Sequence, residues 1–206
     1  MLIDHLGAFA LTALLIELTP GPNMAYLAVL SASYGRLAGL AATFGVALGL
    51  LGVGLAAAFG LAALISQSWL LYEVLRWAGV AYLLWLAWSS WREAEAGSGG
   101  DLSGNGLLKA AFTRGLVTNL LNPKAALFYI AVLPAFVDPT RAVLTQTVAL
   151  SLVYVAVATA IHTSIVLLAA SAQPLLSDPA RSQAVRRALA VALAVIVVWF
   201  AYSTAR

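Results

Sequence analysis

The 206-residue sequence contains no cysteine and few charged residues. Without cysteine, neither a disulfide framework nor thiol chemistry is available to the chain. Charged residues make up only 9% of the sequence and hydrophobic residues 63%, which is typical of a membrane protein rather than a soluble domain. The net charge is +3 and the basic residues are scattered, so we expect contact with lipid headgroups and no binding of nucleic acid.

Several catalytic and cofactor motifs are also missing. The sequence has no HExxH, no GxSxG and no Walker A loop, so no zinc protease, serine hydrolase or ATPase motif is present and no cofactor is predicted. It also lacks an intramembrane cluster of carboxylates, histidines or cysteines that would bind a metal ion. No Lys or Arg precedes Arg36, so we expect the first apolar segment to remain as a span and not to be a cleaved signal.

Six apolar segments are long enough to cross a bilayer as helices, which takes about 20 residues each. They cover residues 5–35, 38–65, 69–91, 107–137, 142–171 and 184–204. The fold class is therefore predicted to be all-α, a polytopic membrane protein with six transmembrane helices. Segment 93–106 is rich in Gly and Ser and is interpreted as a flexible cytoplasmic linker.

The chain repeats itself at half its length. Residues 9–30 align with residues 112–133 at a constant offset of 103, and the matching positions include Phe9 with Phe112, Pro20 with Pro123, and Tyr26 with Tyr129. Each half, 1–92 and 107–206, contains three spans. Three is an odd number, so the two halves must enter the membrane in opposite directions. The sequence therefore predicts two inverted three-helix repeats.

The distribution of Lys and Arg predicts the orientation. The loops and span ends alternate between two sides of the membrane. One side carries seven basic residues: Arg36, Arg92, Lys109, Arg114, Arg181, Arg186 and Arg187. The opposite side carries three: Arg76, Arg141 and Arg206. The richer side should be cytoplasmic, which places both termini outside.

At the start of the second span and within it, Gly35 and Gly39, and then Gly45 and Gly49, form pairs four residues apart. This spacing allows close approach of another helix. We expect that helix to belong to the same chain, and contact with a second copy in a homo-oligomer remains open.

Prolines interrupt the first and fourth spans near their centres. Pro20, Pro22 and Pro123 cannot donate backbone hydrogen bonds and should free the carbonyls of Ile16, Leu18 and Asn119. Polar residues gather at the two breaks, and we interpret the following set as the substrate site: Glu17, Thr19, Pro20, Gly21, Pro22, Asn23, Asn119, Asn122, Pro123 and Lys124. Corresponding broken spans in two halves of a chain are the strongest sequence indication of a transporter's binding site.

The charges at the breaks suit a zwitterion. Lys124 and the N–H groups of the helical turns after Pro22 and Pro123 would hold a carboxylate, whereas Glu17 and the freed carbonyls would accept an ammonium group or a proton. Glu17 and His162 are the candidates for proton coupling, although His162 is more simply a packing residue. Alternatively, Glu17 and Lys124 form a structural ion pair, or each proline only kinks its helix.

Four segments together resemble the LysE/RhtB family of amino-acid exporters. They are Thr19–Asn23 (TPGPN), Asn119–Lys124 (NxxNPK), Leu133–Pro139 (LPAFVDP) and Ala78–Leu84 (AGVAYLL). The resemblance covers nearly the whole chain, and it departs from the family at Ala135 and in the last span, which lacks the usual glycines. It implies a bacterial inner-membrane protein that exports small amino acids or close derivatives, driven by the proton gradient.

Two other functions are weighed against export of amino acids. One is export of another small solute or of a metal ion, for which Glu17 is the only obvious ligand. The other is an intramembrane enzyme, which the missing motifs argue against but do not exclude, because catalytic partners can converge in space.

Overall fold

The computed structural model describes residues 2–19, 21–60, 68–95, 104–171 and 179–203. Its helices are α1 (Leu2–Leu18), α2 (Pro22–Tyr34), α3 (Arg36–Ala58), α5 (Trp69–Glu95), α6 (Asn105–Leu120), α7 (Pro123–Leu127), α8 (Val143–Ser171) and α9 (Pro179–Ser203). A π-helical turn (Phe128–Val132) and a 3-10 turn (Leu133–Phe136) extend α7. All regular structure in these ranges is helical, which confirms the all-α prediction for this part of the chain.

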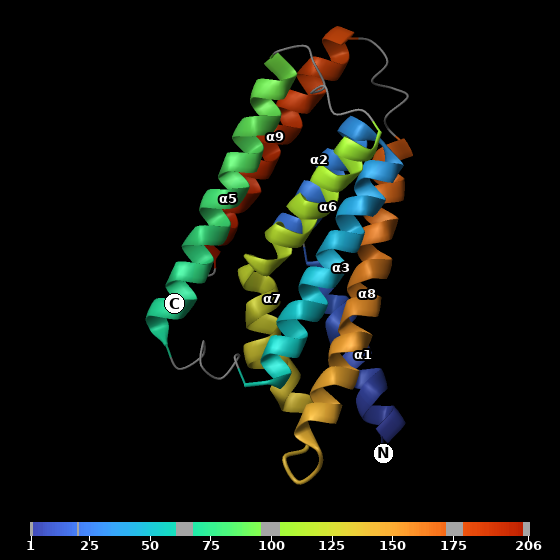
Figure 1. Cartoon of the computed structure of the whole chain (residues 1–206), viewed down its shortest axis with the longest axis vertical. Helices are drawn as coiled ribbons and strands as arrows, with labels where there is room; N and C mark the ends of the chain where they lie inside the picture. The colour runs from blue at the N-terminus through green and yellow to red at the C-terminus, as the bar shows by residue number, and fades with distance from the viewer. Residues whose placement is uncertain (1, 20, 61–67, 96–103, 172–178, 204–206) are drawn as a thin grey trace.

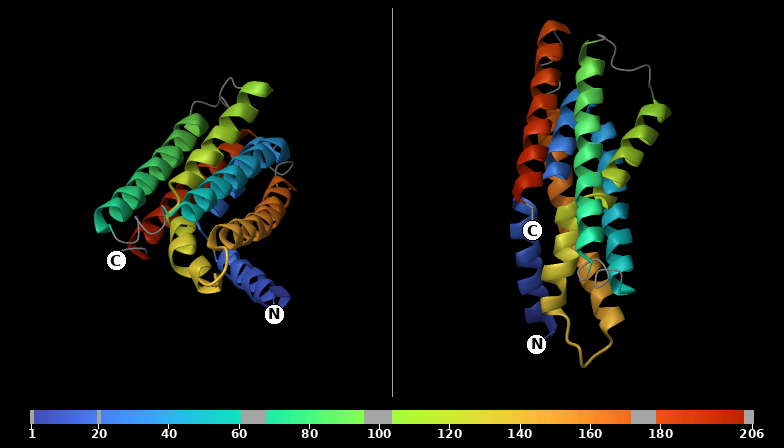
Figure 2. Two further views of the ribbon diagram at one scale, coloured as in Figure 1. Left: turned by 60° about the horizontal axis from the view of Figure 1, so that its bottom comes forward. Right: turned by 90° about the vertical axis from the view of Figure 1, so that its left-hand side faces the viewer.

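The helices form one elongated bundle (Figure 1). Helices α5 and α9 lie side by side on one flank, as both views in Figure 2 show, and α3, α6 and α8 pack together on the other. Helix α2 packs against both α8 and α9 and so joins the two groups. The first described residues of α1 and the last described residues of α9 lie toward one end of the bundle. The C-terminal ends of α2, α5 and α8 lie toward the opposite end (Figure 1).

Length and composition support three membrane spans outright and up to five in total. Helix α3, residues 69–89 of α5, and α8 are each long and apolar enough, and the bent pairs α1–α2 and α6–α7 each count as one more. Within α9 the same measure finds a shorter apolar helix, Ala190–Trp199, and three arginines lie in the turns that precede it. The predicted sixth span is therefore not established by this measure.

Both predicted helix breaks are present. The axis turns by 61° between residues 6–18 and 22–34, and by 44° between residues 105–120 and 123–136. Proline occupies the first position of the helix after each break, Pro22 in α2 and Pro123 in α7, where its missing N–H would have no partner within the helix. Pro20 lies outside the described residues.

Glycine permits the close contact between α3 and its neighbours. A Cβ on Gly45 would lie 2.1 Å from the carbonyl oxygen of Phe112 in α6, and a Cβ on Gly115 would lie 2.2 Å from that of Ala42 in α3. A Cβ on Gly39 would meet Val166 of α8 at 2.6 Å. The prediction that the small residues of this span pack within the same chain is confirmed at these positions.

Two buried apolar clusters hold the bundle together. One joins α2, α5 and α9 through side chains such as Leu27, Leu83 and Leu193. The other joins α1, α3, α8 and the turns after α7, and includes Phe9 and Phe128. Large apolar side chains also cover the outside, among them Phe44, Trp88, Leu152 and Leu168, each more than half exposed. An apolar exterior of this extent suits contact with lipid.

Candidate functional site

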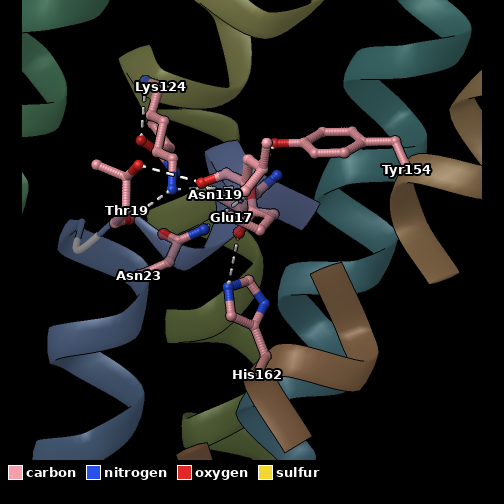
Figure 3. A network of polar contacts seen from close by, with 9 residues as sticks. Glu17, Thr19, Asn23, Asn119, Lys124, Tyr154 and His162 are labelled. Carbon is pink, nitrogen blue, oxygen red and sulfur yellow. Dashed lines mark hydrogen bonds and ion pairs between the residues drawn. The ribbon is translucent and has the colours of Figure 1, made fainter. Parts of the chain in front are cut away.

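The two helix breaks and α8 bring the predicted polar residues into one group (Figure 3). Glu17 is in the last turn of α1, Asn23 in the first turn of α2, Asn119 near the end of α6, Lys124 in the first turn of α7, and His162 in α8. Residues more than 90 positions apart thus meet in the interior of the bundle. These contacts bring residues of the two predicted breaks together.

Glu17 is buried, with 4% of its surface exposed, and three side chains surround its carboxylate. The Tyr154 hydroxyl donates a hydrogen bond of 2.6 Å to Oε1. Lys124 Nζ lies 3.9 Å from the same oxygen, and His162 Nε2 lies 3.4 Å from Oε2. A buried carboxylate needs hydrogen-bonded or charged partners, and the geometry provides both.

Lys124 reaches the break in the first span from the break in the fourth. Its ammonium group donates a 2.9 Å hydrogen bond to the backbone carbonyl oxygen of Thr19. Its side chain also packs against Gly21, where an added Cβ would lie 3.4 Å from Cδ. The separation of 3.9 Å from Glu17 is too long for a hydrogen bond, so the strongest contact of this ammonium group is with the backbone.

Two asparagines connect the same helices beside the charged groups. Asn23 Nδ2 donates a 2.8 Å hydrogen bond to Asn119 Oδ1, and the two residues are 5% and 0% exposed. The remaining amide atoms, Asn23 Oδ1 and Asn119 Nδ2, are buried without a hydrogen-bond partner among the described residues. Unpaired polar atoms of this kind are costly and often mark a ligand site.

His162 is 2% exposed, and neither ring nitrogen makes a hydrogen bond of good geometry within the described ranges. The 3.4 Å approach of Nε2 to Glu17 Oε2 places the imidazole ring beside the carboxylate.

The other predicted residues shape the breaks. Asn122 caps α7, because its side-chain oxygen accepts a 3.0 Å hydrogen bond from the Lys124 N–H. The Thr19 side chain turns back to the Leu15 carbonyl, so Thr19 contributes through its backbone carbonyl. Gly21 precedes α2 as an N-cap without a side-chain acceptor, and the early N–H groups of α2 therefore receive no side-chain cap from it.

One expectation about the freed carbonyls is wrong. The carbonyls of Ile16 and Asn119 already accept backbone hydrogen bonds, from the Thr19 N–H at 3.1 Å and the Asn122 N–H at 2.9 Å. Each helix tightens into a final i to i+3 turn that replaces the bond lost to proline. The carbonyl that accepts an ammonium group is instead that of Thr19, at the break itself.

Comparison with known proteins identifies the family. The family model described as LysE type translocator matches residues 14–206. The chain belongs to the LysE translocator family. It is therefore a membrane transporter, and the group around Glu17 and Lys124 is the interior polar site of a LysE type translocator.

Individual relatives agree with this assignment. The chain is 32% identical to a homoserine/homoserine lactone efflux protein of Salmonella typhimurium over 187 residues, which is 88% of each chain. It is 36% identical to a leucine efflux protein of Enterobacter over 135 residues, 63% of this chain and 62% of the relative. An uncharacterized membrane protein of Vibrio cholerae is 36% identical over 135 residues, 65% of each chain. No solved structure matches at a significant level.

Sequence reasoning missed one residue of this translocator's site, Tyr154. A tyrosine in an apolar span resembles ordinary packing, and only the fold shows that its hydroxyl meets Glu17. A weak signal was available, because Tyr154, Ala158 and His162 are spaced four residues apart and so share one face of α8. Among the described residues, no three His, Cys, Asp or Glu side chains lie close enough together to hold a metal ion.

Proposed function

We propose that this translocator exports small amino acids or close derivatives from the cytoplasm, coupled to the proton gradient, with Glu17 and Lys124 as the substrate site. The observation that carries the proposal is the meeting of these two opposite charges between two broken helices, in the buried interior. An intramembrane ionisable residue is a functional residue by default, and here two of opposite sign are within 3.9 Å. The names of the leucine and homoserine efflux relatives support the substrate class.

The proposed binding mode replaces contacts within the site by contacts with the substrate. The substrate carboxylate binds the Lys124 ammonium group and the N–H groups at the start of α2. Its ammonium group binds Glu17 and the Thr19 carbonyl, which already accepts an ammonium donor. A zwitterion that binds between Glu17 and Lys124 separates a 3.9 Å ion pair and displaces the hydrogen bond of Lys124 to Thr19. The site's net charge does not change when a zwitterion enters, which limits the cost of burial.

Glu17 is the proposed coupling residue. In the proposed cycle Glu17 exchanges the substrate ammonium group for a proton. His162, 3.4 Å from Oε2, is placed to exchange that proton, and Tyr154 fixes the other oxygen. Alternating occupation of Glu17 by a proton and by the substrate ammonium would couple export to the proton gradient.

The proposed topology is six spans in two inverted repeats, 1–92 and 107–206, in the bacterial inner membrane with both termini outside. Equivalent contacts support it: α3 packs on α6 as α8 packs on α1, and α2 packs on α9 as α7 packs on α5. Helix α9 runs alongside α5 and would be the sixth span, with its arginine-bearing first turns at the cytoplasmic face (Figure 1).

Efflux of radiolabelled leucine and homoserine from cells tests the proposal. Cells that produce the wild-type chain should lose preloaded label faster than cells without it, and Lys124→Met should abolish the difference. Membrane insertion must be checked in parallel, because removing one partner of a buried pair can cost about 3–5 kcal/mol. A folded Lys124→Met protein that exports at the wild-type rate would show that Lys124 does not bind substrate.

A further inference from the structure

A second concave site lies at the end of the bundle near the start of α1 and α8. It is a cavity of about 460 Å³, large enough for an amino acid. One wall is apolar and is formed by Leu6, Phe136 and Leu150. The rim is polar and is formed by Asp138, Arg141 and Gln146. Leu6 precedes Glu17 by 11 residues of α1, which corresponds to about 16 Å along the helix, so the cavity is separate from the central site.

A continuous row of aromatic rings separates the cavity from Glu17. Tyr154, which hydrogen-bonds Glu17, stacks on Phe128 with ring centroids 3.7 Å apart. Phe128 meets Phe9 at 5.7 Å, and Phe9 meets Phe136 at 5.2 Å, both edge to face. Phe136 lines the cavity. The rings therefore form a contiguous row between two polar regions, and Phe9 within it is fully buried.

The rim of the cavity is held in place by hydrogen bonds. The Gln146 side chain accepts from the Asp138 N–H and donates to the Asp138 carbonyl, both at 2.9 Å, which ties this loop to α8. Thr140 donates to one Asp138 carboxylate oxygen through its N–H and its hydroxyl, and Arg141 Nε lies 3.2 Å from the other. Nε of Arg141 faces Asp138, and the Arg141 side chain is 62% exposed, so its guanidinium is accessible to a carboxylate.

From this geometry we propose that the cavity is a second binding site for the exported solute, the site from which it is released. The inference rests on the proposed function and adds to it a second, outer location and a recognition chemistry. The ligand is an amino acid with a free carboxylate, which pairs with Arg141, and an apolar side chain, which packs against Leu6, Phe136 and Leu150. The aromatic row is the barrier that the solute must pass between the two sites.

The absence of cysteine makes the test direct, because a single introduced cysteine is the only thiol. Ala149 lines the cavity, and Leu144 is an exposed residue of the same end of α8 that does not. Purified Ala149→Cys and Leu144→Cys proteins are labelled with a maleimide, with and without L-leucine. We expect L-leucine to slow labelling of Ala149→Cys only, and L-leucinol, which lacks the carboxylate, to have no effect. Equal labelling rates with and without L-leucine, or equal slowing at both positions, would overturn the proposal.

Two further variants separate this site from the central one. Protection of Ala149→Cys should persist with Lys124→Met, whereas Arg141→Gln should raise the half-protecting leucine concentration by about two- to fivefold, as for a partly exposed charge pair. Protection lost with Lys124→Met but unchanged with Arg141→Gln would mean that the cavity only responds to the central site. Because Arg141 is exposed, Arg141→Gln should fold. If Lys124→Met does not fold, the effect of Arg141→Gln on protection tests the proposed outer site by itself. If L-leucine protects Ala149→Cys but the chain does not export leucine, the proposed function alone is refuted. If the chain exports leucine but L-leucine does not protect Ala149→Cys, the outer site alone is refuted.

Discussion

Replacing Tyr154 by phenylalanine tests whether the Glu17 carboxylate must be held in position. The substitution removes one hydroxyl, which donates the 2.6 Å hydrogen bond to Glu17 Oε1, and keeps the ring that stacks on Phe128 at 3.7 Å. A hydrogen bond to a charged group contributes about 1.5–3 kcal/mol. If Glu17 must be fixed to bind the substrate ammonium, the ratio of maximal export rate to half-saturating concentration should fall by about 10- to 100-fold.

The assay is initial-rate export over a range of substrate concentrations in proteoliposomes, with Tyr129→Phe as the matched control. Tyr129 is an equally buried neighbour whose hydroxyl donates to the Leu50 carbonyl at 3.0 Å, so its loss should affect stability more than export. In a Glu17→Gln background, Tyr154→Phe should cause little additional loss, since both changes act on one interaction. The reasoning is refuted if Tyr154→Phe exports like wild type, or if its effect is undiminished without the Glu17 carboxylate.

Two further predictions concern packing and topology. Gly45→Leu should reduce the yield of folded protein, because even a Cβ would lie 2.1 Å from the Phe112 carbonyl and overpacking typically costs about 1–3 kcal/mol. Gly52→Leu in the same helix should be tolerated, because its Cβ would meet only a flexible leucine methyl at 4.0 Å, and thermal melting in detergent compares the two. Cysteines added at residues 2 and 206 should both react with an impermeant maleimide in intact spheroplasts, whereas protection of either one contradicts the proposed orientation.

Much of the architecture could be predicted from the sequence because lipid restricts the choices. A span must satisfy its own backbone hydrogen bonds, so hydropathy marks the helices, and proline marks where they break. The bends at Pro22 and Pro123 and the meeting of Glu17 with Lys124 followed from this. Helix α9 was harder, because its first turns carry three arginines.

The details of the site depended on tertiary packing that no local pattern encodes. Proline position indicates which helix bonds are lost, but not whether a tighter turn replaces them, as it does at Ile16 and Asn119. The roles of Tyr154 and of the Thr19 carbonyl arise only when α8 and α7 pack against the first break. Hydropathy likewise gives no indication of the cavity beside Arg141, because its walls come from three separated segments.

The most direct test of the central claim is solute movement by Glu17→Gln in vesicles with an imposed proton gradient. Glutamine keeps the size and hydrogen-bonding capacity of the side chain but cannot carry the proton. If Glu17 couples the two fluxes, the variant will not accumulate leucine or homoserine against a concentration gradient, and it will still exchange labelled for unlabelled solute. Proton-driven accumulation at the wild-type rate, with unchanged pH dependence, would contradict the account and leave His162 as the residue to test for coupling.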